Sequence, residues 1–320
     1  MPFSTFSSIG HQSFTLKLTG VRLSSFNTIN SSTISGVITS TPAGYTNGTM
    51  CGLAVDLFQT KMLFAFTGSV YYATSSNNGV SWTAFTQVSL DSSGAVRHSC
   101  GLRNDGIYGY VITGQKSYTV TWTGATPTFT LFETTVAALC TNSGFYGASM
   151  TPDGLTLMVK LYNGTLYYTR FNGTAFNAFT NTGLTADRVA CAITPDSSTV
   201  YVTTGLQEKY ATITWSGNVG TFSGLQSAVG NRTVDDRALV FLGGNYSGSI
   251  PPKYLFGGMS SLDYYPWNQS TFTATESSYV RPVSGLSIDS TNSYSPCGIL
   301  GNIIYYVNVT SIYTITLNVT

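Results

Sequence analysis

A six-residue segment recurs along the chain at intervals of roughly fifty residues, and this repetition constrains the fold more than any other feature. Each copy begins with a small residue, continues with short apolar positions and reaches a turn residue five places on. The copies are Cys51–Asp56, Cys100–Asp105, Ala148–Asp153, Cys191–Asp196, Cys297–Asn302 and a looser one at Leu239–Gly244. Such self-similarity is typical of solenoids and propellers, in which each repeat is one supersecondary unit.

Three further runs follow each copy, and each run has the composition of a strand. The second run is β-branched and aromatic, as in Met62–Phe66 and Leu157–Leu161. A glycine-containing turn leads to a third, alternating run such as Val70–Ala73. Fourth runs are anchored by Phe85, Phe129, Phe176, Phe222 or Phe272. Four strands joined by tight turns, without helical periodicity, predict one blade of a β-propeller.

The repeats together predict an all-β, six-bladed β-propeller of four-stranded antiparallel blades. We expect residues 1–320 to form this single domain, with repeats starting near residues 51, 100, 148, 191, 239 and 297. The last repeat stops after its third strand. A strand from residues 1–50, which include the strand-like run Ser13–Leu18, is therefore expected to complete that blade and close the ring. Closure would remove the exposed sheet edges that invite aggregation.

The cysteines mark the same register. Four of the five stand at the first position of the repeated segment, with Ala148 in the equivalent place: Cys51, Cys100, Cys191 and Cys297. Inner strands converge on the axis, where an unpaired cysteine packs as a small hydrophobe. A disulfide needs a Cα separation under about 7 Å, which neighbouring inner strands should exceed. No CxxC or CxH spacing indicates a metal site. We predict free thiols, Cys140 included, which fit a reducing compartment.

Composition excludes several classes of function. Charged residues are 8% of the chain and the net charge is +1, so little electrostatic attraction to nucleic acid is expected. No apolar run is long enough to span a membrane, and the first residues lack the pattern of a signal peptide. We therefore expect cytoplasmic synthesis. Phosphate loops and nucleophile elbows are absent from the sequence, so neither cofactor nor metal is expected.

Most of the scarce charges are predicted to gather on one face. Connections between blades hold Arg97, His98, Arg188, Arg237 and Arg281, and turns between second and third strands hold Lys116 and Glu208. In one interpretation, Arg97, Arg188 and Arg237 grip an anion, because a guanidinium matches a carboxylate. In the other, which adjacent Asp187, Asp235 and Asp236 favour, each arginine pins its own connection. We expect His98 to be a hydrogen-bonded loop histidine rather than a catalyst.

The segment SSNNGVSW, Ser75 to Trp82, carries a family motif. It resembles the Asp-box of sialidase-like propellers, Ser-x-Asp-x-Gly-x-Thr-Trp, with Asn77 in the Asp place, Gly79 in the Gly place and Ser81 in the Thr place. It lies between a predicted third and fourth strand, where that family has its box. Degenerate relatives recur in register at Phe171–Phe176, Trp122–Gly124 and Trp215–Gly217. The resemblance implies a propeller with a structural turn remote from chemistry.

The catalytic residues of sialidases match this chain less well. The resemblance would imply an arginine triad, a Tyr nucleophile activated by a Glu, and an Asp acid/base. Glutamate occurs only at Glu133, Glu208 and Glu276, and the family's Phe-Arg-Ile-Pro element has at most an echo in Val280–Pro282. No catalytic role is therefore carried over, and Arg97, Arg188 and Arg237 are candidates for anion contact alone.

These observations favour a binding or structural module over an enzyme. We expect a surface component that recognises a glycan or a protein neighbour. The Ser-, Thr-, Asn- and Tyr-rich, charge-poor composition suggests a virion as its setting. Two alternatives stay open: a sialidase-like glycosidase or lyase that acts on an acidic sugar at the charged face, and a scaffold whose rim docks a protein. Propellers host many unrelated functions, so the fold does not choose among them.

Overall fold

A computed structural model describes most of the chain. The described residues are 29–45, 51–66, 69–90, 98–113, 116–133, 145–161, 164–186, 191–194, 196–204, 207–229, 238–242, 254–258, 262–266, 280–283, 299–300, 303–308 and 311–319. Within these ranges every regular element is a β-strand. The predicted all-β class is confirmed.

The first three sheets along the chain are four-stranded and antiparallel, and their strands pair in sequence order. The first contains β2 (Cys51–Val55), β3 (Lys61–Phe66), β4 (Ser69–Thr74) and β5 (Thr86–Val88). The second contains β6 (His98–Leu102), β7 (Tyr108–Thr113), β8 (Lys116–Thr123) and β9 (Thr126–Glu133). The third contains β10 (Phe145–Met150), β11 (Thr156–Leu161), β12 (Thr165–Arg170) and β13 (Thr180–Thr185).

The next two sheets continue the pattern. One contains β14 (Cys191–Ile193), β15 (Thr199–Thr204), β16 (Gln207–Ser216) and β17 (Val219–Phe222), and β18 (Gln226–Val229) also pairs with β16. The other contains β19 (Ala238–Leu242), β20 (Tyr254–Gly258), β21 (Leu262–Pro266) and β22 (Val280–Val283).

A further sheet joins strands from opposite parts of the sequence. It contains β23 (Ile299–Leu300), β24 (Ile303–Asn308), β25 (Ser311–Val319) and β1 (Ile29–Ser40), in the order β1-β25-β24-β23. β1 is antiparallel to β25, with Ile34 opposite Ile315, and register shifts interrupt the pairing. The run Ser13–Leu18 lies outside the described residues.

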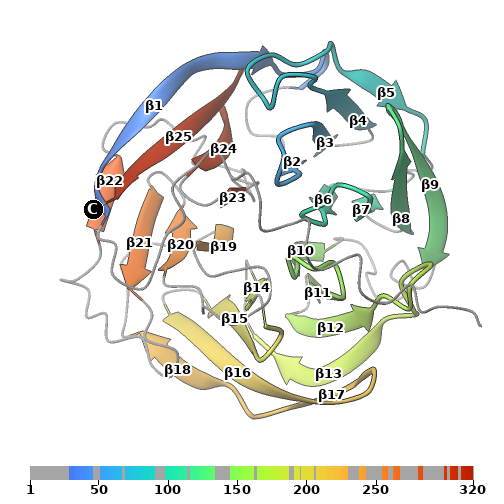
Figure 1. Cartoon of the computed structure of the whole chain (residues 1–320). Coiled ribbons are helices and arrows are strands. Elements are labelled where there is room, and N and C mark those ends of the chain that lie inside the picture. Colours follow the sequence, from blue (N-terminus) through green and yellow to red (C-terminus); the bar gives the residue numbers. More distant parts are fainter. Residues whose placement is uncertain are drawn as a thin grey trace, which may run out of the picture.

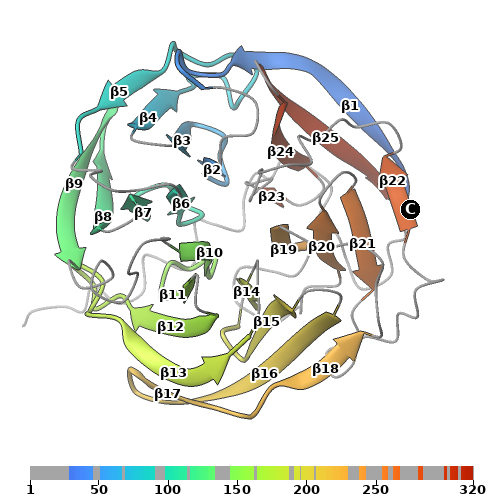
Figure 2. The same cartoon turned by 180° about the vertical axis from the view of Figure 1, so that it is seen from behind.

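The sheets are arranged side by side around a common centre (Figure 1). In each sheet one end strand of the pairing order, namely β2, β6, β10, β14, β19 or β23, lies nearest the centre. Strands such as β5, β9, β13 and β1 lie at the periphery. The view from behind shows the same arrangement (Figure 2).

The repeated small residue lies in the innermost strand wherever it is described. Cys51, Cys100, Ala148, Cys191 and Leu239 belong to β2, β6, β10, β14 and β19, and each pairs with a second strand. Cys100 and Cys191 are buried free thiols. Cys140 and Cys297 lie outside the described ranges.

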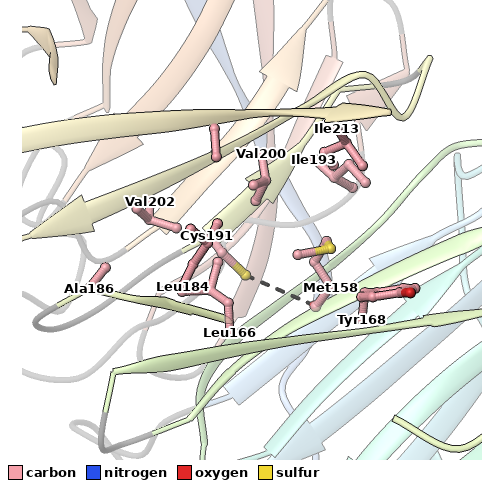
Figure 3. Packing of buried hydrophobic residues seen from close by; sticks show 11 residues of the cluster. Met158, Leu166, Tyr168, Leu184, Ala186, Cys191, Ile193, Val200, Val202 and Ile213 are labelled. Atoms are coloured by element: carbon pink, nitrogen blue, oxygen red, sulfur yellow. Dashed lines mark hydrogen bonds between the residues drawn. The ribbon is translucent and has the colours of Figure 1, made fainter. Parts of the chain in front are cut away.

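The described core is divided among the contacts between neighbouring sheets. One cluster lies between the β10–β13 and β14–β17 sheets and includes Met158, Leu166, Ile193 and Val202 (Figure 3). In it the Cys191 Sγ lies 3.9 Å from the carbonyl oxygen of Met158. A second cluster, which includes Tyr110 and Val159, covers the other face of the β10–β13 sheet, and this explains why β11 is buried at every residue. A strand covered on both faces reads as a continuous apolar run rather than an alternating one.

The peripheral strands depart most from expectation. Phe129 and Phe222 lie within β9 and β17, as predicted. Phe85, in contrast, directly precedes β5, and Phe176 forms an isolated bridge with Phe171 before β13 begins. Both aromatic rings pack in the core clusters. The recurrence of these phenylalanines in the sequence therefore indicates buried positions, not positions within a strand. Phe272 is outside the described residues.

Candidate functional site

The predicted charged face is only partly described. Arg97, Arg188 and Arg237 lie outside the described ranges, so their convergence stays a prediction. Glu208 is the second residue of β16, and Arg281 is the second residue of β22. Arg281 thus lies in a fourth strand rather than in a connection between blades.

His98 and Lys116 lie in one row across the β6–β9 sheet. His98 begins β6 and pairs with Thr113 of β7, which in turn pairs with Lys116 at the start of β8. His98 is buried within a strand, not in the loop that we expected. Burial lowers the pKa of His98 from 6.5 to about 4. Its imidazole is therefore neutral at pH 7 and adds no positive charge for binding an anion.

The Asp-box-like segment forms a closed turn between β4 and β5. The Asn77 side chain organises it: Oδ1 accepts from the Ser81 backbone N at 2.9 Å, and Nδ2 donates to Ser81 Oγ at 2.8 Å. Ser75 Oγ donates to Asn77 Oδ1 at 2.8 Å and accepts from the Gly79 backbone N at 2.9 Å. Gly79 adopts a φ of 82°, a left-handed value that favours glycine. The polar residues of the motif therefore bond to one another.

The same turn packs against the last sheet. The Trp82 ring lies perpendicular to that of Tyr305 in β24, with centroids 6.5 Å apart. The Tyr305 hydroxyl donates to Gln59 Oε1. A Cβ on Gly79 would lie 2.8 Å from that hydroxyl, so only glycine allows this approach. The described contacts of this turn thus give it a structural role.

Turns between first and second strands bond directly from sheet to sheet. The Leu57 N donates to the Asn104 carbonyl at 2.8 Å, and the Asn104 N donates to the Pro152 carbonyl at 3.0 Å. These residues follow β2, β6 and β10 respectively. One face of the molecule, which we call the turn face, is formed by these turns and by those between third and fourth strands. Its backbone is fixed across three sheets.

The repeated aspartates support the individual turns. Asp153 Oδ1 accepts from Thr151 Oγ1 at 2.6 Å and from the Leu155 N at 2.9 Å. Asp196 repeats this arrangement with Thr194. Such side-chain bonds to nearby backbone are the reason that aspartate favours turns. Asp153 and Asp196, which end two copies of the repeated segment, therefore form hydrogen bonds within their own turns.

Asp56, the corresponding acid after β2, is fully buried. Its carboxylate accepts from the Thr60 N and Oγ1, both at 2.7 Å, and from the Lys61 N at 2.8 Å. Burial raises the pKa of Asp56, while these hydrogen bonds and the Lys61 charge oppose that rise.

A cation stacked on tryptophan joins the β2–β5 sheet to the β6–β9 sheet. Lys61 Nζ lies 5.7 Å from the centre of the Trp122 ring and donates to the Gly106 carbonyl at 3.0 Å. Trp122 is 2% exposed, and the Tyr72 ring lies perpendicular to it. We call this contact the Trp122 seam. The Lys61 ammonium group thus forms its hydrogen bond with the backbone of the neighbouring sheet.

An analogous contact joins the β10–β13 sheet to the β14–β17 sheet. The Arg170 guanidinium carbon lies 4.5 Å from the centre of the Trp215 ring. Arg170 Nη1 donates to Thr156 Oγ1 at 2.9 Å, and Trp215 Nε1 donates to the Ser197 carbonyl at 2.7 Å. Both Arg170 and Trp215 are partly exposed. We call this contact the Trp215 seam.

The sequence does not predict the two seams, although it shows the recurrence of their tryptophans. Trp122 and Trp215 begin the in-register elements WTG and WSG, and both are the second-last residues of third strands. Their cations are not in register, because Lys61 begins a second strand and Arg170 ends a third strand. A periodicity search therefore finds the tryptophans and misses their partners.

The described residues contain no group of three or more His, Cys, Asp or Glu side chains able to hold a metal. The same residues include no helix long and apolar enough to cross a membrane.

Fold and sheet order define the class of protein as a β-propeller, and comparison with solved structures agrees. The β-propeller domain of Cps50 (Swd1) from Myceliophteria thermophila superposes with a TM-score of 0.53 at 8% identity, covering 91% of this chain and all of that one. A putative 6-phosphogluconolactonase from Bacteroides fragilis gives a TM-score of 0.51 at 13% identity, covering 75% and 70%. At these identities the likeness concerns the fold alone.

Sequence comparisons add no family. No protein-family model matches the chain, and no curated protein sequence is significantly similar to it.

Proposed function

We propose that this chain is a non-catalytic, six-bladed β-propeller, a single domain over residues 1–320, that recognises a glycan as a surface or virion component. The six sheets in sequence order support the blade number. Pairing of β1 with β25 supports closure of the ring by an N-terminal strand. The internal hydrogen bonds of residues 75–82 support the resemblance to an Asp-box.

The observation that carries the binding role is the backbone bonding of the turn face. Hydrogen bonds from Leu57 to Asn104 and from Asn104 to Pro152 fix neighbouring turns relative to one another. A surface held in one conformation loses little freedom when a ligand binds, and this raises affinity. Rigid elements also hold binding groups more accurately than independent loops.

The groups on that face favour a sugar. Exposed amides occur at the turns between third and fourth strands of three sheets, at Asn77, Asn172 and Asn218. Asn77 and Asn172 each hold their own turn through Oδ1 and one Nδ2 hydrogen, which leaves the second Nδ2 hydrogen of each amide for a sugar hydroxyl. Acids in the turns between first and second strands on the same face, such as Asp153, are engaged by their own turns. An uncharged, hydrogen-bonding surface therefore dominates the described part of the face.

A glycan array that includes neutral and acidic glycans tests this proposal, together with turnover assays on a fluorogenic sialoside and a sugar lactone. We expect binding of at least one glycan class without turnover. Sialoside hydrolysis that is lost on Arg188→Ala would instead establish a sialidase-like glycosidase at the charged face. Lactone hydrolysis would establish an activity of the kind named for the Bacteroides fragilis protein. An array without binding would overturn glycan recognition and leave protein docking.

The predicted charged face is proposed as a second candidate site, separate from the turn face. Arg97, Arg188 and Arg237, together with Lys116 and Glu208, are proposed for contact with an anion or for holding the connections between blades. A charge-reversal series distinguishes these roles. Loss of stability on Arg188→Glu with unchanged ligand binding would assign that arginine to its connection.

A further inference from the structure

The two arginines whose side chains are described differ in how their charge is balanced. Arg103 pairs with Asp105 and stacks on Tyr108, with its guanidinium carbon 4.6 Å from the ring centre. Arg170 stacks on Trp215, and its Nη1 donates to the neutral hydroxyl of Thr156. No carboxylate pairs with Arg170 within the described part of the chain. A cation is thus left uncompensated in a chain where charged residues are only 8%.

The Arg170 guanidinium is held in a fixed orientation by groups from two sheets. The Trp215 ring supports one flat side, and Thr156 Oγ1 accepts from Nη1. Thr156 Oγ1 lies 3.1 Å from Ser197 Oγ, and the Ser197 carbonyl accepts from Trp215 Nε1. The Arg170 Nε is covered and has no hydrogen-bond partner among the described residues. A guanidinium has five donors; with Nε covered and one Nη1 hydrogen bonded to Thr156, three Nη donors are left without a partner among the described residues.

The charge and the surroundings define the ligand that would fit. One guanidinium balances one carboxylate and binds it through two parallel hydrogen bonds, whereas a phosphate dianion would retain a net charge. The side-chain hydrogen bond of this cation goes to a neutral group, the Thr156 hydroxyl. The turn that follows Arg170 is also neutral and polar: Asn177 Nδ2 donates to the Arg170 backbone carbonyl at 2.9 Å, and exposed Asn172 lies in the same turn. A single cation beside a neutral polar turn suits a sugar that carries a carboxylate.

We propose that Arg170, oriented by Trp215 and Thr156, is a binding subsite for the carboxylate of an acidic sugar. This inference deepens the glycan recognition proposed above and rests on it. It places the anion contact on the turn face, on the opposite side of the ring from the predicted cluster of Arg97, Arg188 and Arg237.

The test compares D-galacturonate with D-galactose, which differ in the carboxylate, by two-dimensional ¹H–¹⁵N NMR of the Arg170 Nε–Hε group. Arg170→Lys identifies the signal by its loss. We expect galacturonate to shift this signal in a saturable way and galactose to leave it unmoved. In the Arg170→Met variant, galacturonate affinity followed by the backbone amides of residues 172–177 should fall at least tenfold. Thr156→Val should weaken binding by a smaller factor.

Lys61→Met is the matched control, because it removes the stacked cation of the Trp122 seam. Galacturonate affinity should remain unchanged in this variant. Equal affinity of the wild type and Arg170→Met would overturn the subsite, as would an equal response to galactose. If glycans bind on an array but are insensitive to Arg170→Met, the subsite is wrong and glycan recognition stands. If the array is empty while galacturonate still shifts Arg170, the anion site stands without the proposed function.

Discussion

The Trp122 and Trp215 seams are built on the same position of the fold and use their cations differently. Each tryptophan is the second-last residue of a third strand and precedes a hairpin whose first loop residue is a glycine with positive φ, Gly124 at 74° and Gly217 at 60°. Lys61 donates to the Gly106 carbonyl beneath buried Trp122. Arg170 rests on partly exposed Trp215 and bonds to a hydroxyl.

The difference shows how one scaffold can separate cohesion from recognition. A cation whose hydrogen bond ends on a backbone carbonyl of the next sheet contributes to the contact between sheets. A guanidinium with unused donors at the surface contributes less to cohesion and can bind a ligand. Stacking on an aromatic ring is worth about 0.5–1 kcal/mol at exposed sites and more when desolvated. The Trp122 seam should therefore dominate stability, and the Trp215 seam should dominate recognition.

Removal of the rings should separate the seams most clearly. Trp122→Ala should lower the free energy of unfolding by about 3–5 kcal/mol, because a fully buried ring leaves a cavity. Trp215→Ala should cost about 2 kcal/mol, since part of that ring is already in water. Urea unfolding followed by circular dichroism measures both. Equal losses would contradict the distinction between the seams.

Acid should destabilise the β6–β9 sheet, which contains Trp122, because protonation of His98 favours the unfolded state. A buried histidine with a lowered pKa stabilises the fold above its unfolded pKa of 6.5, and this stability is lost as pH falls toward about 4. At 1.36 kcal/mol for each unit, the loss is about 3 kcal/mol.

His98→Gln should remove most of this slope between pH 6.5 and 4, and Trp215→Phe should retain it. Urea unfolding at stepped pH provides the measurement. A wild-type slope that persists in His98→Gln would assign the acid sensitivity to other groups.

The glycine beside Lys61 offers a sharper probe of the Trp122 seam. Gly106 has a φ of 68°, and a Cβ there would lie 2.9 Å from the Asp56 Cβ. Gly106→Ala therefore combines backbone strain with a clash and should cost about 2–3 kcal/mol. Gly124→Ala, at a φ of 74° with no atom within 4 Å, is the matched control and should cost about 1 kcal/mol. Similar losses in thermal unfolding would show that the turn relaxes around the new methyl group.

The smallest effect should come from the cations themselves. Lys61→Met should cost about 1–2 kcal/mol, because it removes a hydrogen bond to a carbonyl and a charge near buried Asp56. Arg170→Met should cost less than about 1 kcal/mol, because its hydrogen bond and stacking are partly exposed. Urea unfolding of the two variants side by side gives the order. A reversed order would make Arg170 a stability residue and weaken its assignment to a ligand.

The sequence predicted the fold through features that every blade must repeat. A small residue recurs where strands crowd near the centre, and Cys100 and Cys191 are buried at those positions; the looser copy has Leu239 there. Asp153 and Asp196 recur because the same turn is needed after each inner strand. The clusters between sheets repeat the apolar second strands for the same reason.

The site was harder to predict because it is not periodic. Arg170 gains its environment from Thr156 in its own sheet and from Ser197 and Trp215 in the next, a combination that occurs once among the described residues. His98 was expected in a loop, yet the β-strand begins at that residue and buries its ring. The residues at which a strand begins and ends depend on packing between sheets, which cannot be read from a single sequence.

Pairing of β1 with β25 makes one sheet depend on segments separated by most of the sequence. During synthesis, residues 29–40 leave the ribosome before residues 311–319 and have no partner strand until that segment follows. Contacts of such long range also slow folding, because a large loop must close before they form. The intervening sheets, whose strands pair with near neighbours in sequence, can assemble while β1 waits. Completion of this sheet should therefore be a late event, and the unpaired β1 is a segment that molecular chaperones would encounter.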